Sequence, residues 1–382
     1  MTENIGNPQI RFSGFDDTWE QRKFSEFAQR ESTFRSSSSD YPSVEYEDVV
    51  AGEGRLNKDV RQKETQKNGI VFDGTQVLYG KLRPYLHNWL NPDFTGVAVG
   101  DWWVLRPVGM DKKFLYRLIQ TQQFDEVANQ SSGSKMPRAD WNLVSNTEFT
   151  IPSSIDEQRH IAETFDDLDN LITLHQRKYD KLTKVKKSML DKMFPKNGSN
   201  VPEIRFKGFS DAWEQRKANE LCFISTGKSN TQDRIEEGKY PFYVRSPIIE
   251  RSNRYLFDEE AVLTVGDGVG TGKVFHYVNG KYDLHQRVYR MYGFSESVLA
   301  KYFYYYFSTH FYDRVMSMTA KTSVDSVRYE MIADMDIVLP KVEEQRKICS
   351  CFEQLDNLIT LHQRELEKLK NLKKACLEKM FV

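Results

Sequence analysis

The chain has 382 residues, enough for two to three domains at the usual size of about 100–200 residues per domain. Hydrophobic residues make up 39 % of the chain and charged residues 29 %, a composition that permits a packed core and excludes a wholly disordered protein. The 54 basic and 55 acidic residues leave a net charge of −1, so any surface that binds nucleic acid must be local.

The sequence contains no signal for a membrane, a leader or a metal site. No apolar run approaches the roughly 18 residues that a membrane span needs, and the opening MTENIGNPQI lacks a basic start followed by an apolar core. The cysteines have no zinc-like spacing and are expected to be free thiols of a reducing compartment; they are Cys222, Cys349, Cys351 and Cys376. We therefore expect a cytoplasmic protein.

Two segments of the chain occur twice. PQIRFSGFDDTWEQRK at 8–23 returns as PEIRFKGFSDAWEQRK at 202–217, and the stretch 155–194 returns at 342–381 with LDNLITLHQR identical in both copies. The chain is therefore a duplication. The predicted boundaries are a first short repeat at 1–23, a variable domain at 24–150, a long helix at 151–194, a linker with the second short repeat at 195–217, a second variable domain at 218–338 and a C-terminal helix at 339–382.

The longer repeats are predicted to be helices that pair. Apolar residues recur at alternating steps of three and four, as in a coiled coil. A helix over 156–194 would be roughly 58 Å long at ~1.5 Å per residue. Two equal helices in one chain most simply pair antiparallel about a pseudo-twofold axis, with His175 and His362 near the crossing. The predicted seam is Ile161, Phe165, Leu168, Ile172, His175, Leu182, Ile348, Phe352, Leu355, Ile359, His362, Leu366 and Leu369.

Both variable domains have the pattern of α+β folds. The segments 124–152 and 311–340 each run from a helical stretch through a small polar, basic loop to a strand that ends at proline. The segments 77–90 and 261–277 combine strand-like alternation with glycines and basic residues, as sheet edges and turns do. The predicted fold class is thus two α+β domains separated by an antiparallel pair of long, coiled-coil-like helices.

Basic and aromatic side chains in the predicted loops suit a nucleic-acid duplex. Phosphates take cations and hydroxyl donors, whereas base edges take forked donors such as arginine. Solvated loop residues would explain any single position equally well. The candidates are Lys81, Arg83, Tyr85, Ser134, Lys135 and Arg138 in the first domain and Lys228, Tyr243, Arg245, Lys273, Arg287, Lys321, Thr322 and Ser323 in the second, with Trp102 interleaved among them.

Two segments resemble functional motifs of enzymes, but each lacks residues that its motif requires. GDGVGTGK at 266–273 has Asp267 in place of the first glycine of a phosphate loop and Val274 in place of its final hydroxyl residue, so a structural turn is favoured. Asn91-Pro92-Asp93-Phe94 resembles an adenine-methylating tetrapeptide, but it has Asp93 where the second proline belongs. No set of nucleophile, base and orienting residue is evident, and a non-catalytic protein is predicted.

Over essentially its whole length the chain resembles the specificity subunits of type I restriction-modification systems. The resemblance rests on WEQRK at 19–23 and 213–217, the Pro-to-EQR segments at 152–159 and 340–346, and the repeated LDNLITLHQR. It implies that each domain reads one half of a split DNA target and that the helices set the spacer and dock two modification subunits. Those partners would bind S-adenosylmethionine and methylate adenine, and restriction subunits would use ATP to translocate and cleave, with Mg²⁺ also expected on partner subunits and no cofactor on this chain.

Two other functions stay open on the residues alone. The chain could be a coiled-coil scaffold whose domains bind proteins, which its many tyrosines would suit. It could also be an independent nuclease, on a faint pattern of Pro92-Asp93 followed by Asp111-Lys112-Lys113. Salt-dependent binding to a duplex separates the DNA reader from the scaffold, and magnesium-dependent cleavage by the chain alone would identify a nuclease.

Overall fold

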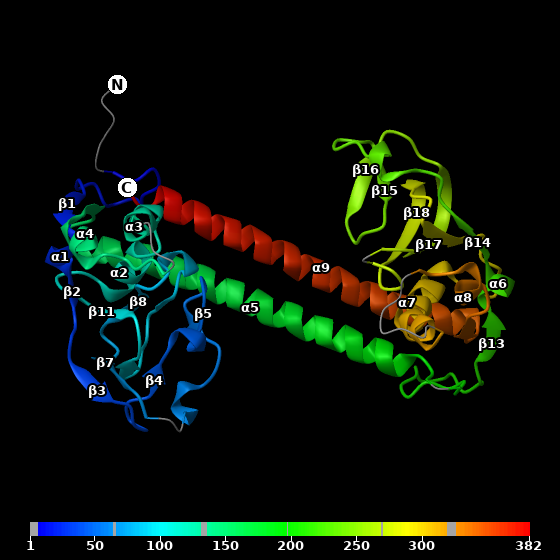
Figure 1. Ribbon diagram of the computed structural model, residues 1–382, viewed down its shortest axis with the longest axis horizontal. Coiled ribbons are helices and arrows are strands. Elements are labelled where there is room, and N and C mark those ends of the chain that lie inside the picture. The colour runs from blue at the N-terminus through cyan, green and yellow to red at the C-terminus, as the bar shows by residue number, and fades with distance from the viewer. Residues whose placement is uncertain (1–6, 64–65, 131–135, 197, 269, 319–325) are drawn as a thin grey trace. The chain divides into compact units, whose positions relative to one another are not determined.

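The computed structural model describes residues 7–63, 66–130, 136–196, 198–268, 270–318 and 326–382. The chain forms two compact units, one made of residues 1–176 with 363–382 and the other of residues 177–362. The two long helices, α5 (Ile155–Met193) and α9 (Val342–Lys379), each contribute one half to each unit (Figure 1). Each predicted variable domain lies within one unit.

The first unit contains two four-stranded sheets, ordered β3-β7-β10-β4 and β2-β11-β8-β9, and a strand pair β1-β12. Helices α2 and α3 and strand β8 contribute to the same core as Phe165 of α5. In chain order its elements before α5 are β1 (Glu20–Lys23), α1 (Phe24–Phe27), β2 (Ala28–Arg30), β3 (Phe34–Ser36), β4 (Ser43–Val44), η1 (Tyr46–Asp48), β5 (Val49–Val50), β6 (Arg55–Leu56), η2 (Val60–Gln62), β7 (Asn68–Phe72), β8 (Val77–Gly80), η3 (Pro84–Leu86), β9 (Trp89–Leu90), β10 (Gly96–Ala98), β11 (Trp102–Pro107), α2 (Lys112–Leu118), α3 (Gln122–Ala128), α4 (Trp141–Asn146) and β12 (Glu148–Ile151).

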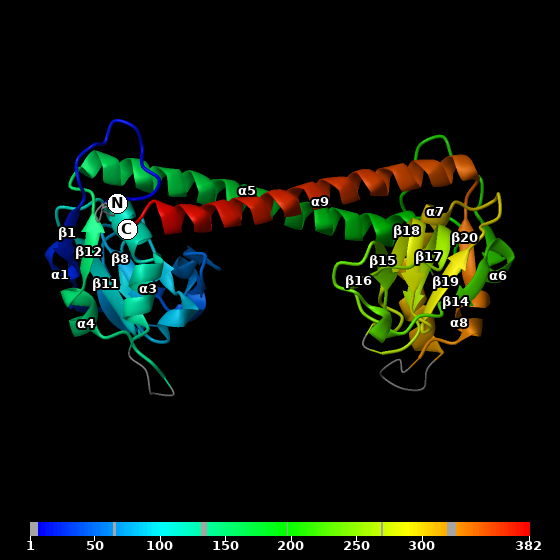
Figure 2. The same ribbon diagram turned by 90° about the horizontal axis from the view of Figure 1, so that it is seen from above.

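The second unit has one six-stranded sheet, ordered β14-β19-β17-β18-β15-β16, and the strand pair β13-β20. Figure 2 shows the strands of the sheet side by side, and α7 packs on β17 and β18. Its elements before α9 are β13 (Glu214–Lys217), α6 (Ala218–Leu221), β14 (Phe223–Thr226), η4 (Thr231–Asp233), β15 (Tyr240–Tyr243), β16 (Ile249–Ser252), β17 (Phe257–Val265), β18 (Phe275–Leu284), β19 (Val288–Tyr292), α7 (Ala300–Ser317), α8 (Tyr329–Ala333) and β20 (Asp336–Leu339).

The repeated EQR segments at the starts of the long helices anchor each unit in the same way. The Glu157 carboxylate accepts two hydrogen bonds from Arg11, at 2.7 and 2.9 Å, and Glu344 accepts two from Arg205, at 2.7 and 2.8 Å. The next residue, a glutamine, satisfies the free amide at the start of another helix: Gln158 accepts from Asp111 N at 2.8 Å. Its counterpart in the second unit accepts from the amide that precedes α7 at 2.9 Å. These contacts explain why the same glutamate and glutamine stand in both copies.

Within each unit the two helix halves run antiparallel. In the first, Asp169 pairs with Lys373 at 2.7 Å, and in the second Lys186 pairs with Asp356. The helix expected over 156–194 is observed at Ile155–Met193, whereas the segment bounds 151–194 and 339–382 begin too early, at residues that still belong to β12 and β20. Pro195 follows soon after the end of α5, where its ring cannot continue the helix. Seam members in the hydrophobic clusters of the two units are Ile161, Phe165, Leu168, Leu369, Ile348, Phe352 and Leu355; Leu366 is buried, and Ile172, His175, Leu182, Ile359 and His362 are half-buried.

His175 and His362 belong to different units, and their predicted approach stays a prediction. The predicted proximity of the end of α9 to the first short repeat is confirmed within the first unit, where Ile10 N donates to Lys379 O at 3.0 Å. The second unit repeats this contact between Ile204 N and Lys192 O at 2.9 Å.

Candidate nucleic-acid interface

In the first unit three segments that are far apart in sequence meet at the end of β8. The Lys81 amide donates to Asp101 O at 2.9 Å, and the Lys81 carbonyl accepts from Ala139 N at 2.9 Å. A single bridge joins Leu82 to Arg138. This backbone arrangement brings together Lys81 and Arg138, two of the cations that the sequence predicts to contact nucleic acid.

Both cations face the same carboxylate. Arg138 Nη2 lies 3.1 Å from Asp101 Oδ2, and Lys81 Nζ lies 3.5 Å from Asp101 Oδ1. Partial burial raises the pKa of Asp101, but the hydrogen bond and charge of Arg138, together with Lys81, outweigh that effect and hold the pKa below its ordinary value. Asp101 therefore remains ionised and fixes the two cations beside each other.

The second unit builds the same backbone at the end of β17. The Gly266 amide donates to Arg287 O at 2.8 Å, the Gly266 carbonyl accepts from Val327 N at 2.7 Å, and a bridge joins Asp267 to Ser326. Lys81 thus corresponds to Gly266 and Asp101 to Arg287. The frame is kept, while the side chains on it differ.

The charges at this position of the second unit are arranged differently. The central carboxylate is Asp267, which lies on the turn itself, 3.5 Å from Arg245 Nη1 and 3.7 Å from Arg287 Nε. Both arginines are exposed, and both belong to the predicted set. Sequence reasoning identified the cations of both units but missed the carboxylates, Asp101 and Asp267, because the pairing joins segments that only the fold brings together.

Apart from Tyr243, the remaining predicted contacts fall into three groups. Tyr85 is 53 % exposed, Lys228 is exposed, and Lys273 is exposed with its ammonium 4.6 Å from the centre of the Tyr312 ring. Arg83 is half-buried in the turn that follows Lys81. Ser134, Lys135, Lys321, Thr322 and Ser323 lie outside the described residues.

Two aromatic residues that the sequence places among the loop contacts belong to the core instead. Tyr243 is 7 % exposed, because its ring packs against His276 and Tyr282, and burial raises the pKa of its hydroxyl. Trp102 is buried beside Tyr46 at the start of β11. The expectation fails for these two rings because both residues lie in strands whose neighbouring side chains, Trp103 and Phe242, are buried as well, so both faces of the sheet are covered at these positions.

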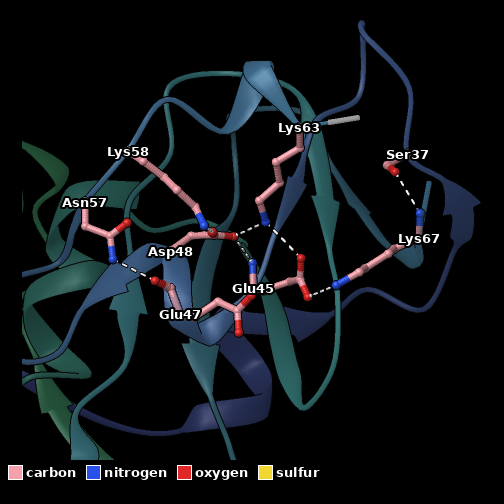
Figure 3. A network of polar contacts seen from close by, with 8 residues as sticks. All are labelled: Ser37, Glu45, Glu47, Asp48, Asn57, Lys58, Lys63 and Lys67. Atoms are coloured by element: carbon pink, nitrogen blue, oxygen red, sulfur yellow. Dashed lines mark hydrogen bonds and ion pairs between the residues drawn. The ribbon is translucent and has the colours of Figure 1, made fainter. Parts of the chain in front are cut away.

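A second charged cluster in the first unit ties down the segment between η1 and β7 (Figure 3). The side chain of Asp48 is fully buried at the end of η1; Lys58 Nζ lies 2.9 Å from it, and Lys63 bridges it to Glu45. Glu45 also holds Lys67. Burial raises the pKa of Asp48, but the hydrogen bonds from Lys63 and Lys58 lower it further than burial raises it.

In the second unit the corresponding short helix, η4, carries the same reciprocal cap, formed by Asn230 and Asp233. There Asp233 holds one arginine, Arg254, at 2.7 Å, and the buried Asp283 lies 3.4 Å from the same guanidinium. Both clusters have a structural role, because each of these cations is paired with a carboxylate and each cluster fixes a loop to the sheet.

Neither a metal centre nor a membrane span is found in the part of the chain that the structure describes. Its residues contain no group of three or more histidine, cysteine or acidic side chains placed to hold a metal ion. Within the same residues, no helix combines the length and the apolar character needed to cross a bilayer.

Two units on one backbone frame, each with its own set of cations, define a duplicated two-domain protein whose domains differ in their surface side chains. The sequence matches the family of the type I restriction modification DNA specificity domain twice, at residues 16–184 and 210–371, and the chain belongs to this family. It is a specificity subunit of a type I restriction-modification system.

Individual relatives agree with this assignment. The chain is 24 % identical over 291 residues to the type I restriction enzyme MjaVIII specificity subunit of Methanocaldococcus jannaschii, covering 69 % of this chain and 68 % of that protein. It is 28 % identical over 148 residues to the EcoDI specificity subunit of Escherichia coli, covering 38 % of this chain and 31 % of that protein. The fold is similar to the crystal structure of a type I system S subunit from M. genitalium, with a TM-score of 0.71 at 14 % identity, covering 98 % and 99 % of the two chains.

Proposed function

We propose that the chain reads a bipartite, asymmetric target on double-stranded DNA, with one recognition domain for each half. The observation that carries this proposal is the pair of cation-bearing turns, which occupy equivalent backbone in the two units and present different side chains. Lysine and arginine neutralise phosphates, and the arginine fork also reads base edges. Because the two surfaces differ, the two half-sequences should differ as well.

The repeated helices are proposed as the spacer between the half-sites and as the docking surface for two modification subunits. Half-sites one duplex turn apart lie ~34 Å from centre to centre. The 39 residues of α5 correspond to a helix of roughly 58 Å, which is long enough to set such a spacing. Leu171 and Leu174 of α5 and the same two positions of α9, Leu358 and Leu361, are exposed and offer apolar surface to a partner.

Catalysis is assigned to the partners in this proposal. Modification subunits would bind S-adenosylmethionine and methylate adenine, and restriction subunits would use ATP and Mg²⁺, while this chain positions them on cytoplasmic DNA. The absence of a nucleophile, base and orienting residue from the sequence motifs is consistent with this division of labour.

The test is to map methylated adenines genome-wide in cells that carry this chain with its modification subunits. We expect two unlike half-sequences separated by a fixed gap. Arg138→Ala should relax or weaken reading of one half, by about tenfold in binding, and Arg287→Ala should affect only the other half. Binding to the duplex should also fall steeply with salt.

Three results would contradict the proposal. A continuous target would remove the division into half-sites. A loss of binding that is equal on all sequences for both variants would reduce these arginines to phosphate contacts. Binding to protein partners with no salt-dependent affinity for a duplex would identify a scaffold.

A further inference from the structure

The turn that follows β8 contains two residues in a conformation that side chains disfavour. Arg83 has φ +50° and His87 has φ +55°, on either side of η3. Among the described residues these are the two non-glycine positions with positive φ. Backbone strain of this kind is retained where the surrounding structure needs the side chain in that place.

The second unit shows that the turn itself does not need these side chains. Counted from the equivalent bridges at Leu82 and Asp267, the positions of Arg83 and His87 are occupied by Gly268 (φ +87°) and Gly272 (φ +66°). The internal hydrogen bond is also kept, from Leu86 N to Arg83 O at 2.8 Å and from Thr271 N to Gly268 O at 3.1 Å. Glycine adopts this backbone freely, so the side chains in the first unit require another explanation.

For His87, contacts within its own unit explain why a side chain is present at this position. Its Nε2 lies 2.9 Å from Asp125 Oδ1, and its ring stacks on Trp89 with centroids 5.1 Å apart and an interplanar angle of 21°. The histidine therefore fastens the turn to helix α3 and strand β9. These contacts offset the strain at position 87.

Arg83 has no such explanation. Its Nε is buried and has no hydrogen-bond partner among the residues that the structure describes. Buried donors in native proteins are almost always paired. Because Arg83 as a whole is only half-buried, its side chain can still meet a partner from outside the chain. The Arg83 amide, by contrast, is firmly held, donating to Pro137 O at 2.7 Å. The backbone thus presents this guanidinium from a fixed position.

The surroundings indicate what that partner is. Lys81 begins the same turn and Arg138 lies on the segment that is bridged to Leu82; both are already paired with Asp101, while Tyr85 and Leu86 of the turn are exposed. A phosphate can be neutralised by any nearby cation, so phosphate binding would not require an arginine at a strained backbone position. A guanine edge requires a planar fork at a fixed place, because its O6 and N7 accept two parallel hydrogen bonds.

We propose that Arg83 is the specificity-determining residue of the first unit and reads the major-groove edge of a guanine in the half-target of that unit. The inference rests on the proposed function, since it requires that this unit bind duplex DNA. It further assigns no corresponding side-chain reader to the turn of the second unit, where Gly268 and Gly272 leave only backbone at these positions.

The experiment compares Arg83→Gly, Arg83→Lys and the matched control His87→Gly in the full chain assembled with its modification subunits. The probes are duplexes that carry the target mapped by methylation, with each G·C pair of each half replaced in turn by A·T. For Arg83→Gly we expect affinity for the unaltered target to fall about tenfold to hundredfold, with discrimination lost at one G·C pair of one half. Arg83→Lys should lose the same discrimination, because a point charge cannot bond both acceptors.

His87→Gly relieves strain in the same turn, so retained discrimination in that variant assigns the effect to the guanidinium. Retained discrimination in Arg83→Gly or Arg83→Lys, an equal loss on every duplex, or a half-target without a G·C pair would overturn the inference and leave the proposed function intact. A wild-type assembly with no sequence preference would overturn both. Thermal unfolding of Arg83→Gly at or above the wild-type midpoint shows that lost discrimination is not lost folding.

Discussion

Asp169 and Asp356 occupy the same position in the two copies of the long helix, and each is held by a lysine of the other helix, Lys373 or Lys186. Each of these carboxylates also accepts a hydrogen bond from its own domain, and this additional donor differs between the two units. In the first unit it is the buried Arg117, at 2.7 Å from Asp169, and in the second it is the Tyr305 hydroxyl, which donates to Asp356 at 3.0 Å. The repeated helix thus presents one carboxylate to two unlike domains, and each domain meets it with a different donor.

At a second position of the two helices the contact is of the same kind in both units. Asp166 takes Lys113 at 2.7 Å, and its counterpart Glu353 takes Lys301 at 2.6 Å. The carboxylate–lysine pairs of the long helices are kept across the duplication, even where an additional donor differs, whereas the side chains on the turns that bear the candidate DNA contacts are not kept. The comparison teaches that divergence was tolerated where a side chain leaves the frame and was resisted where it joins the frame together.

The prediction with the largest expected effect tests whether the long helices pack into the hydrophobic core of the two units in the same way. Phe165 and Phe352 are corresponding residues, fully buried, whose rings lie 6.1 Å from Phe381 and 6.0 Å from Phe194. Truncation of either to alanine should cost about 3–5 kcal/mol, from lost burial and the cavity left behind. Urea unfolding with hydrogen exchange measured for each unit would show which unit opens first.

We expect Phe165→Ala to increase exchange mainly in residues 7–176 and 363–382 and Phe352→Ala mainly in 177–362. Leu171→Ala serves as the control, because Leu171 is exposed and its truncation should change stability little. Unequal losses, with one phenylalanine costing less than about 1 kcal/mol, would show that the two junctions are not built alike.

The two duplicated helices could be predicted from sequence, although the segment bounds 151–194 and 339–382 begin too early, because an apolar period of three and four and an identical LDNLITLHQR are local signals. GDGVGTGK at 266–273 lies between β17 and β18, where a turn was expected, and the rejection of a phosphate loop stays a prediction. Structural features that depend on a few neighbouring residues, such as these helices and this turn, could therefore be predicted from the sequence.

The site was recoverable only in part, because its geometry is assembled from distant segments. The position of Asp101 beside Lys81 and Arg138 depends on the pairing of β8 with β11 and on the bridge at Leu82. No sequence signal marks Arg83 as left-handed, since arginine rarely adopts positive φ. Only the equivalence with Gly268 in the second unit reveals why that backbone is unusual.

The second prediction tests where the units differ. Asp48 accepts from Glu45 N at 2.7 Å and binds Lys58 and Lys63, and all of these lie in the first unit. Asp48→Asn should cost about 2 kcal/mol at pH 7, because it removes the buried carboxylate that pairs with the partly buried Lys63 and the more exposed Lys58. Asp233→Asn is the matched variant in the second unit and should cost less, since Asp233 is more exposed.

The sign of the pH dependence follows from the lowered pKa of Asp48. A carboxylate whose folded pKa lies below its ordinary value of about 3.9 stabilises the fold above that value and loses the contribution as pH falls through the lowered one. The stability difference between wild type and Asp48→Asn should therefore be constant from neutral pH down to about pH 5 and shrink on further acidification. A difference that grows below about pH 4 would contradict the assigned ion pairs.

The prediction with the smallest expected effect compares the lysine–aspartate ion pair between the long helices in the first unit with the corresponding pair in the second unit. Lys373→Met and Lys186→Met each remove a half-exposed ion pair, which should contribute less than about 1 kcal/mol. The losses should nevertheless be unequal. Asp169 keeps the charged Arg117 when Lys373 is removed, whereas Asp356 keeps only the neutral Tyr305 hydroxyl when Lys186 is removed, so Lys186→Met should be the costlier change.

Double-mutant cycles with Asp169→Asn and Asp356→Asn, repeated at high salt, measure the two coupling energies directly. The coupling of Lys186 with Asp356 should exceed that of Lys373 with Asp169, and both should weaken as salt screens them. Equal couplings would mean that the helices set this contact by themselves, whatever each domain contributes. A larger coupling at Lys373 would show that the buried arginine strengthens the neighbouring pair by fixing the carboxylate, instead of competing with the lysine for it.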